Sequence, residues 1–188
     1  FEQKISKKLN AKYAISVNSA TSALHLACIA LELSVNDLLW TSPISFVASA
    51  NCARYCSAKV DFMDIDPSTG LISIPKLIHK LERAEKNGNL PKIVVPVHLA
   101  GTSCDMKSIY SLANKYGFKV IEDASHALGG KYHGKPVGNC RYSDITIFSF
   151  HPVKIITTGE GGVALTNNPD LALNMQMNRS HGITKNPD

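Results

Sequence analysis

The sequence predicts an α/β fold with three layers, in which helices cover both faces of a mostly parallel central sheet. Two observations carry this prediction. Short apolar runs, which are typical of buried strands, alternate along the chain with amphipathic segments of helical period. Glycine, proline, asparagine and aspartate stand between these segments, as expected for successive strand–helix units.

The first half of the chain alternates strands and helices after an opening segment that looks helical. Tyr13–Val17 is predicted as a strand, and Thr21–Leu33 as a helix because its apolar residues form one stripe. Leu38–Thr41 is an apolar strand that a Ser-Pro pair ends. Phe46–Tyr55 is predicted as a helix, and Val60–Asp64 as a strand that is closed by Asp-Pro and Thr-Gly turn signals.

The second half continues the same pattern. Pro75–Lys86 is predicted as a helix with proline in its first turn, and Ile93–Val97 as a continuous apolar strand. Met106–Tyr116 is a helix with Asp105 as its N-cap and Gly117 as its terminator. Three further strands and a last helix follow: Lys119–Ile121, Ile145–Phe150, Val163–Thr166 and Pro169–Met177.

Length and composition favour a single globular domain over residues 1–188. Hydrophobic residues make up 44% and charged residues 19% of the 188, which is ordinary for a globular protein. The net charge of +5 is dispersed, which argues against nucleic acid as a partner. The sequence shows neither a membrane-length apolar run nor a signal peptide, and its five cysteines are odd in number. We therefore expect a cytoplasmic protein with reduced thiols.

Functional groups in parallel sheets gather at the carboxyl ends of strands. This rule alone singles out five positions or segments: Asn18, Ser42–Phe46, His98, Asp123 and Ser149.

Three of the local motifs admit both a functional and a purely structural interpretation. Asp123 could bind a metal, a ribose or a protonated ring nitrogen, or it could simply cap a helix. Lys154 lies in an apolar, glycine-flanked stretch, where partial desolvation would favour a nucleophilic amine; it could equally be a surface lysine. The small residues of Asn18–Ser22 could bind a phosphate at a helix start, or serve as an ordinary cap.

Other motifs fall short of a known site. Gly129 to Lys135 resembles a phosphate-binding loop, but Pro136 replaces the hydroxyl residue that would reach a metal, so a turn is predicted. No G-x-G-x-x-G follows the first strand, which weakens a dinucleotide-binding hypothesis. Cys52 and Cys56 have no second cysteine or histidine pair to complete a metal site, and the histidines lack metal-binding spacing, so no metal is expected.

Taken together, the motifs resemble the sugar aminotransferases of the DegT/DnrJ/EryC1/StrS family, within the fold-type-I enzymes that use pyridoxal 5′-phosphate (PLP). The resemblance covers essentially the whole chain. It rests on these segments: Asn18–Leu24, Ser42–Val47, Pro96–Gly101, Glu122–Ala127, Ser149–Lys154, Glu160–Gly162 and Arg179–Gly182. Within the family, Ser42–Ala50, Asn139–Asp144 and His151–Lys154 most resemble PseC-type enzymes, which aminate C4 of a UDP-linked 4-keto-6-deoxy-N-acetylhexosamine on the route to pseudaminic acid.

The resemblance implies a role for each matching residue. Lys154 resembles the lysine that holds PLP as a Schiff base and moves the substrate proton. Asp123 resembles the partner of the ring nitrogen, His126 the residue near the phenolic oxygen, and Phe46 the aromatic that stacks on the ring. The phosphate-binding residues are implied in the same way: Ala20, Thr21 and Ser149.

The resemblance also implies glutamate as the amino donor and a homodimer whose active sites form at a twofold interface. Family members are about twice as long, so we expect this chain to be the PLP-binding large domain of a longer protein, without its first segment and its small C-terminal domain. Two alternatives stay open. A PLP-dependent sugar dehydratase of the same family would lack the lysine found at Lys154. A non-catalytic truncated remnant or scaffold subunit is the other.

Overall fold

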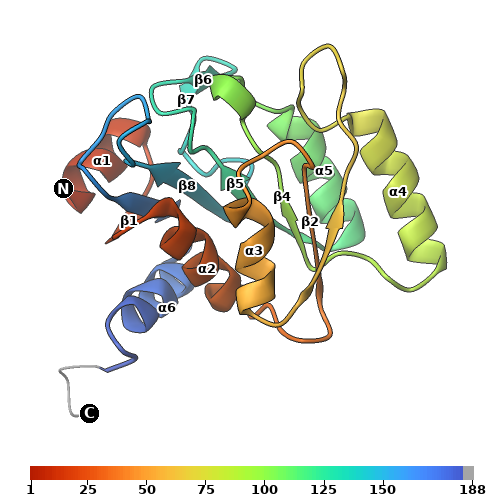
Figure 1. Cartoon of the computed structure of the whole chain (residues 1–188), viewed down its shortest axis with the longest axis horizontal. Coiled ribbons are helices and arrows are strands. Elements are labelled where there is room, and N and C mark those ends of the chain that lie inside the picture. The colour runs from red at the N-terminus through yellow and green to blue at the C-terminus, as the bar shows by residue number, and fades with distance from the viewer. Residues whose placement is uncertain (184–188) are drawn as a thin grey trace.

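The computed structural model describes residues 1–183, and its strands form a seven-stranded sheet in the order β1-β9-β8-β5-β4-β2-β3 (Figure 1). The strand bounds are β1 Tyr13–Val17, β2 Leu38–Thr41, β3 Lys59–Phe62, β4 Ile93–Val95, β5 Lys119–Asp123, β8 Ile145–Ser149 and β9 Gly162–Thr166. β9 is antiparallel to both of its neighbours, β1 and β8, whereas the other neighbouring pairs are parallel. The predicted α/β fold with a mostly parallel sheet is confirmed.

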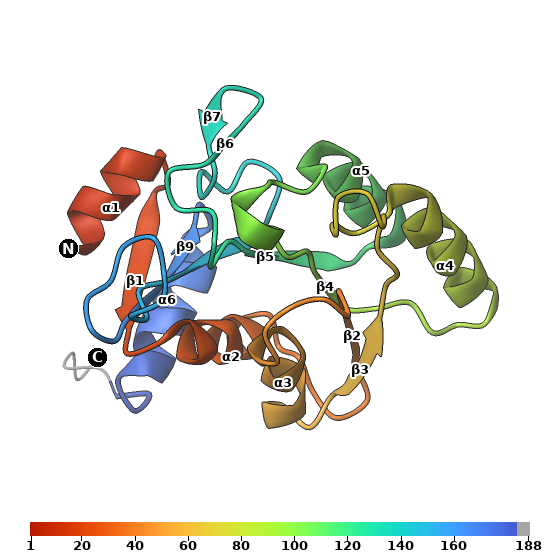
Figure 2. The same cartoon turned by 45° about the horizontal axis from the view of Figure 1, so that its top comes forward.

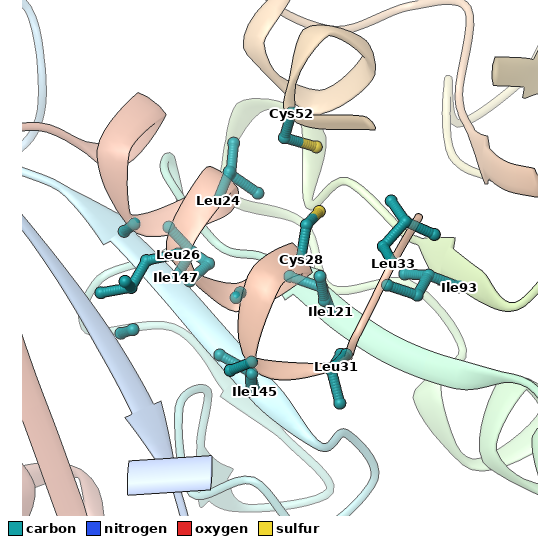
Figure 3. Packing of buried hydrophobic residues seen from close by; sticks show 14 of the residues in the cluster. Leu24, Leu26, Cys28, Leu31, Leu33, Cys52, Ile93, Ile121, Ile145 and Ile147 are labelled. Carbon is teal, nitrogen blue, oxygen red and sulfur yellow. The ribbon is translucent and has the colours of Figure 1, made fainter. Parts of the chain in front are cut away.

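Helices cover both faces of the sheet, as Figure 2 shows with α2, α3 and α6 below it and α1, α4 and α5 above it. The bounds are α1 Glu2–Leu9, α2 Ala20–Ala30, α3 Ala48–Tyr55, α4 Ile74–Lys86, α5 Met106–Tyr116 and α6 Pro169–Arg179. The core on the α2 side is drawn in Figure 3, where Leu26 of α2 lies beside Ile147 of β8.

The inner strands β4, β8 and β9 are buried along their whole length because both faces of the sheet are covered there, whereas the edge strand β3 is largely exposed. In β5, Ile121 belongs to the core under α2 and α3, and its neighbour Val120 to the core under α4 and α5. In β8, Ile147 belongs to the core under α2, and its neighbour Phe148 to the core under α1. Successive side chains of a strand point to opposite faces, so a strand covered on both sides shows no polar alternation.

The helix ends follow from their capping residues. Ser19 accepts a hydrogen bond from the backbone N–H of Ser22 and so caps α2. Asp105 caps α5 as predicted, by accepting from the N–H of Ser108, and Gly117 ends that helix with a left-handed φ of 79°. These caps fix where α2 and α5 meet the sheet.

The structure differs from the sequence prediction in the lengths of some elements and in one hairpin. α2 ends at Ala30 and α3 begins at Ala48, so Phe46 lies in the loop that precedes α3. A short hairpin was not predicted: β6 Lys131–Tyr132 pairs with β7 Lys135–Pro136. Its two turn residues both have positive φ, and they lie in the segment that the sequence predicted as a turn.

Across residues 1–183, the helices are all too short or too polar to cross a bilayer. The same residues contain no cluster of histidine, cysteine and carboxylate side chains that could hold a metal ion.

Candidate active site

A cavity of about 190 Å³ lies where β5 and β8 end, beside the first turn of α2. All of the residues to which the family resemblance gave a role line this cavity: Ala20, Thr21, Phe46, Asp123, His126, Ser149 and Lys154. They come from four separate segments of the chain. The carboxyl edge of the parallel strands brings them together, as expected for this type of sheet.

The first turn of α2 offers backbone donors to this cavity. The N–H groups of Ser22 and Ala23 are occupied by the Ser19 side chain and carbonyl, respectively. Those of Ala20 and Thr21 have no acceptor among residues 1–183. These free donors and the positive end of the helix dipole together favour an anion at this point.

Close backbone packing holds this helix start in place. Gly162, the first residue of β9, lies against Ser19 and Ala20, so that a Cβ at Gly162 would be 2.5 Å from the Ala20 nitrogen. Ser149, at the end of β8, adds a hydroxyl group to these backbone donors. Its hydroxyl oxygen accepts a long hydrogen bond of 3.4 Å from the His151 amide, which leaves the hydroxyl proton available to a ligand.

Asp123 is a buried carboxylate, 5% exposed, at the end of β5. Its Oδ2 accepts a 2.6 Å hydrogen bond from Ser49 of α3, and its Oδ1 accepts one of 3.1 Å from the Ser125 amide. Because Ser49 uses its proton on Asp123, the 2.7 Å contact between the two hydroxyls makes Ser45 the donor to Ser49. Asp123 is thus held by a chain of hydroxyls and does not cap a helix.

Sequence reasoning missed Ser49. Ser49 and Asp123 are 74 residues apart in the chain, and only the packing of α3 on the sheet brings them together. The one local signal was the spacing of Ser45 and Ser49, which places two hydroxyls about one helical turn apart.

Lys154 is half-buried in the loop between β8 and β9. The loop is closed by a hydrogen bond from the Phe150 amide to the Gly161 carbonyl, at 2.9 Å, and Lys154 itself donates its amide to His151. Burial lowers the pKa of His126, and the positive charge of Lys154 lowers it further, while the charge of Asp123 acts in the opposite direction. His126 is therefore neutral at physiological pH and can both donate and accept a hydrogen bond.

Phe46 lines the cavity but is 69% exposed. Its ring lies free of the core because the residue precedes α3, whose first buried position is Ala48. The cavity therefore collects donors for an anion, a carboxylate for a protonated group, an unpacked aromatic ring and an amine. This set fits a flat, phosphorylated aromatic ligand.

The strand-end rule also named residues that lie outside the cavity. His98 is fully buried; its Nε2 donates to Glu122 at 2.7 Å, and its Nδ1 accepts the amide of Cys104. Glu122 accepts two more hydrogen bonds, from Ser143 and Thr146. Burial alone would raise the pKa of Glu122, but the interaction with His98 and the weaker hydrogen bonds from Thr146 and Ser143 outweigh burial and hold the pKa below its usual value. This cluster lies on the face of β5 opposite to Asp123, because neighbouring strand residues alternate.

Asn18 and Ser42 also lie outside the cavity lining, and so does Arg179 from the last of the family-like motifs. Arg179 donates to Glu2 at 2.6 Å and to the Ser16 carbonyl at 3.1 Å. It therefore ties α6 to α1 and β1, which is a structural contact.

The DegT/DnrJ/EryC1/StrS aminotransferase family matches the chain over residues 1–188. A UDP-4-amino-4,6-dideoxy-N-acetyl-beta-L-altrosamine transaminase of Campylobacter jejuni is 45% identical over 98% of this chain and 47% of its own length. The structure of Helicobacter pylori PseC, an aminotransferase involved in pseudaminic acid biosynthesis, superimposes with a TM-score of 0.86 at 36% identity, covering 98% of this chain and 48% of that one.

The structure of NtdA from Bacillus subtilis, which has bound PMP as cofactor, gives a TM-score of 0.82 at 31% identity, over 94% of this chain and 38% of that one. The chain thus spans about half the length of the curated relatives it matches. Because the family matches the whole chain and a relative is 45% identical, the protein belongs to the DegT/DnrJ/EryC1/StrS aminotransferase family.

Proposed function

We propose that this chain is the PLP-binding part of an aminotransferase that transfers an amino group from glutamate to a nucleotide-linked 4-keto-6-deoxy sugar. One observation carries the proposal. In a chain of this family, Lys154, Asp123 and the free N–H groups at the start of α2 line the same cavity.

The cavity residues fit PLP group by group. The free N–H groups of Ala20 and Thr21, with the Ser149 hydroxyl, would hold the phosphate. The buried Asp123 would hold the proton of the ring nitrogen, and the exposed Phe46 ring would stack on the ring face. His126 would meet the phenolic oxygen as a neutral hydrogen-bonding partner.

When bound, PLP supplies an aldehyde that carries the amino group and a ring that accepts the electrons of a deprotonated carbon. The chain's own residues would do the rest. Lys154 would bind the cofactor covalently and then move the proton to and from the substrate carbon as base and acid. Ser45 and Ser49 hold Asp123 in a fixed orientation, so its charge is in position before the ligand binds.

The substrate proposal is a UDP-linked 4-keto-6-deoxy-N-acetylhexosamine, as in pseudaminic acid or a related surface-sugar pathway. The names of two relatives support it: the Campylobacter altrosamine transaminase and Helicobacter PseC. Glutamate as donor and a cytoplasmic location follow from the same resemblance.

We further propose that the protein is a homodimer that closes this cavity with its second copy. Apolar side chains from two segments stand exposed beside the cavity: Ile44, Phe46, Val47, Val153, Ile155 and Ile156. Val153 is 79% exposed, although it lines the cavity. Exposed apolar side chains grouped around one cavity are typical of an interface between subunits. Light scattering on the full-length protein should give a dimer that Ile155→Lys dissociates and Leu173→Lys, on α6, leaves intact.

PLP titration tests the cofactor proposal directly. The full-length protein should develop the visible absorbance of lysine-bound PLP, and borohydride reduction should place the cofactor mass on the peptide that contains Lys154. Lys154→Ala should abolish both signals, and Lys107→Ala, at an exposed lysine of α5, should keep them. A band that survives in Lys154→Ala, or cofactor mass on another lysine, would refute the assignment.

Product analysis tests the reaction. Full-length protein with glutamate and the UDP-4-keto sugar should yield the 4-amino sugar and 2-oxoglutarate. Loss of water from the sugar without amine transfer would instead identify a dehydratase. Cofactor binding without either product would indicate a non-catalytic subunit.

A further inference from the structure

A buried histidine and a buried glutamate join the ends of β4 and β5 behind the cavity. His98 is fully buried, and Glu122, which immediately precedes Asp123, is 6% exposed. The Nδ1 atom of His98 accepts the amide of Cys104 at 3.2 Å, so the ring carries its proton on Nε2. That proton is donated to Oε1 of Glu122 at 2.7 Å. Neither His98 nor Glu122 lines the cavity, so a direct contact with a ligand does not account for this pair.

The backbone of Asp123 is held by the segment that carries His98. The Asp123 amide donates to the Pro96 carbonyl at 2.9 Å, and the Asp123 carbonyl accepts from the His98 amide at 3.0 Å. These two bonds form an isolated bridge between Val97 and Asp123, beyond the regular pairing of β4 with β5. Amides two residues apart in a strand face the same neighbour, so the proline at position 96 removes a bond to β5 just before this bridge.

Side chains on the opposite face of β5 reinforce the pairing that the proline weakens. The hydrogen bond between His98 and Glu122 joins the two segments directly. Glu122 is also fixed from the other side, because its Oε2 accepts from Ser143 at 2.9 Å and from Thr146 of β8 at 2.8 Å. Hydrogen bonds to an ionised acceptor are about twice as strong as those between neutral groups. The Glu122 carboxylate therefore ties the end of β4 to β5 and β8.

The segment after His98 also supports His126. The turn Leu99–Gly101 packs so closely against the His126 backbone that a Cβ at Gly101 would stand 2.9 Å from the His126 carbonyl oxygen. The His98 ring fixes the start of this turn, and it holds the Cys104 amide that follows the turn. A displacement of His98 would therefore disturb both Asp123 and His126.

We propose that His98 and Glu122 are positioning residues for the cofactor site: their buried hydrogen bond holds the backbone of Asp123 in place and so aims its carboxylate into the cavity. The inference rests on the proposed function, in which this carboxylate meets the ring nitrogen of PLP. The Ser49 hydroxyl and the Ser125 amide restrain the side chain of Asp123. The pair behind the strand restrains its main chain, so both parts of the residue are fixed before a ligand binds.

A double variant removes the pair without leaving a buried charge alone. Replacement of both partners of a buried hydrogen bond by apolar groups of similar shape can be nearly neutral for stability, so His98→Leu/Glu122→Met should fold. The hydroxyls of Ser143 and Thr146 lie 3.1 Å apart and can then pair with each other. Thr166→Val is the matched control, because it removes the hydrogen bond of a fully buried side chain at the end of β9 remote from the cavity.

Amide hydrogen exchange of the full-length protein without cofactor is the first measurement. The amides of Asp123 and His98 should exchange about tenfold or more faster in the double variant than in the wild type, which is the effect of losing one charge-assisted hydrogen bond. Thr166→Val should leave these two rates unchanged. His98→Gln, whose side-chain amide can donate to Glu122 as the imidazole does, should restore slow exchange.

PLP titration is the second measurement. The double variant should bind PLP about tenfold or more weakly, because a displaced Asp123 loses its charge-assisted hydrogen bond to the ring nitrogen. Thr166→Val and His98→Gln should bind PLP as the wild type does. Wild-type exchange at Asp123 in the folded double variant would overturn the proposal, and so would faster exchange with unchanged PLP affinity.

Two further outcomes are separable. A wild-type protein that binds no PLP would contradict the proposed function, while the exchange rates measured without cofactor still decide whether the pair holds Asp123. If the double variant does not fold, Glu122→Gln decides instead. Its hydrogen bond from His98 is between neutral groups, so the Asp123 amide should exchange about threefold faster than in the wild type, and an unchanged rate would refute the role of the pair.

Discussion

Replacing Gly162 with alanine should damage both the stability of the protein and its anion-binding helix start. The added Cβ would stand 2.5 Å from the backbone nitrogen of Ala20 and closer still to the Ser19 carbonyl group. The clash would set the backbone of β9 against the backbone of α2, and both are held in place. Gly162 pairs with Val17 of β1 and Ser149 of β8, and α2 packs on the core. Neither side can rotate away.

The expected cost follows from that overlap. Overpacking a well-filled site costs about 1–3 kcal/mol, and a clash with backbone places Gly162→Ala at the upper end of this range. The neighbouring Gly161 gives a matched control. A Cβ there would meet the Thr158 hydroxyl, which is the end of a rotatable side chain, and otherwise comes no nearer than 3.4 Å to Phe150. Gly161→Ala should cost about 1 kcal/mol or less, mainly by disturbing the Thr158 hydrogen bond.

Urea unfolding of the two variants and the wild type measures the difference, with the slope of the transition confirming that the unfolded states are alike. PLP titration should show weaker binding in Gly162→Ala, because the N–H groups of Ala20 and Thr21 are displaced. If the two variants have the same free energy of unfolding, the close approach of β9 to α2 does not hold the helix start in place.

Further predictions concern the buried carboxylates and the exposed ring. Ser49→Ala should lower the free energy of unfolding by about 1.5–3 kcal/mol, because Asp123 loses a charge-assisted hydrogen bond, and Ser49→Thr should retain most of it in the same urea assay. Glu122 has a lowered pKa, so its contribution to the free energy of unfolding is present above about pH 4.5 and is lost as the pH falls through the folded-state pKa. The Glu122→Gln variant should therefore lose less stability than the wild type as the pH is lowered. An unchanged dependence of stability on pH would contradict this prediction. Phe46→Ala should leave the unfolding midpoint within experimental error, because the ring is exposed, but weaken PLP binding by about 1 kcal/mol, or about fivefold; equal PLP affinity would exclude stacking.

Several features of the fold could be predicted because their causes are local. The apolar runs at Ile93–Val95 and Ile145–Ser149 are read directly as strands, since burial on both faces removes polar alternation. The Asp105 cap and the Gly117 end of α5 depend only on residues next to one another. Element ends were less predictable, as with α3, because the packing of Ala48 rather than local preference decides where the helix begins.

The cavity was predictable as a set of residues but not as a set of interactions. The sequence by itself determined which side chains stand at strand ends and at the start of α2, because chain order and the parallel sheet bring these points to one edge. Only the tertiary structure decided that Ser49 holds Asp123, and that His98 pairs with Glu122 on the opposite face of β5. Each of these contacts joins segments far apart in the chain, so it depends on how helices pack on the sheet, and no local pattern records that packing.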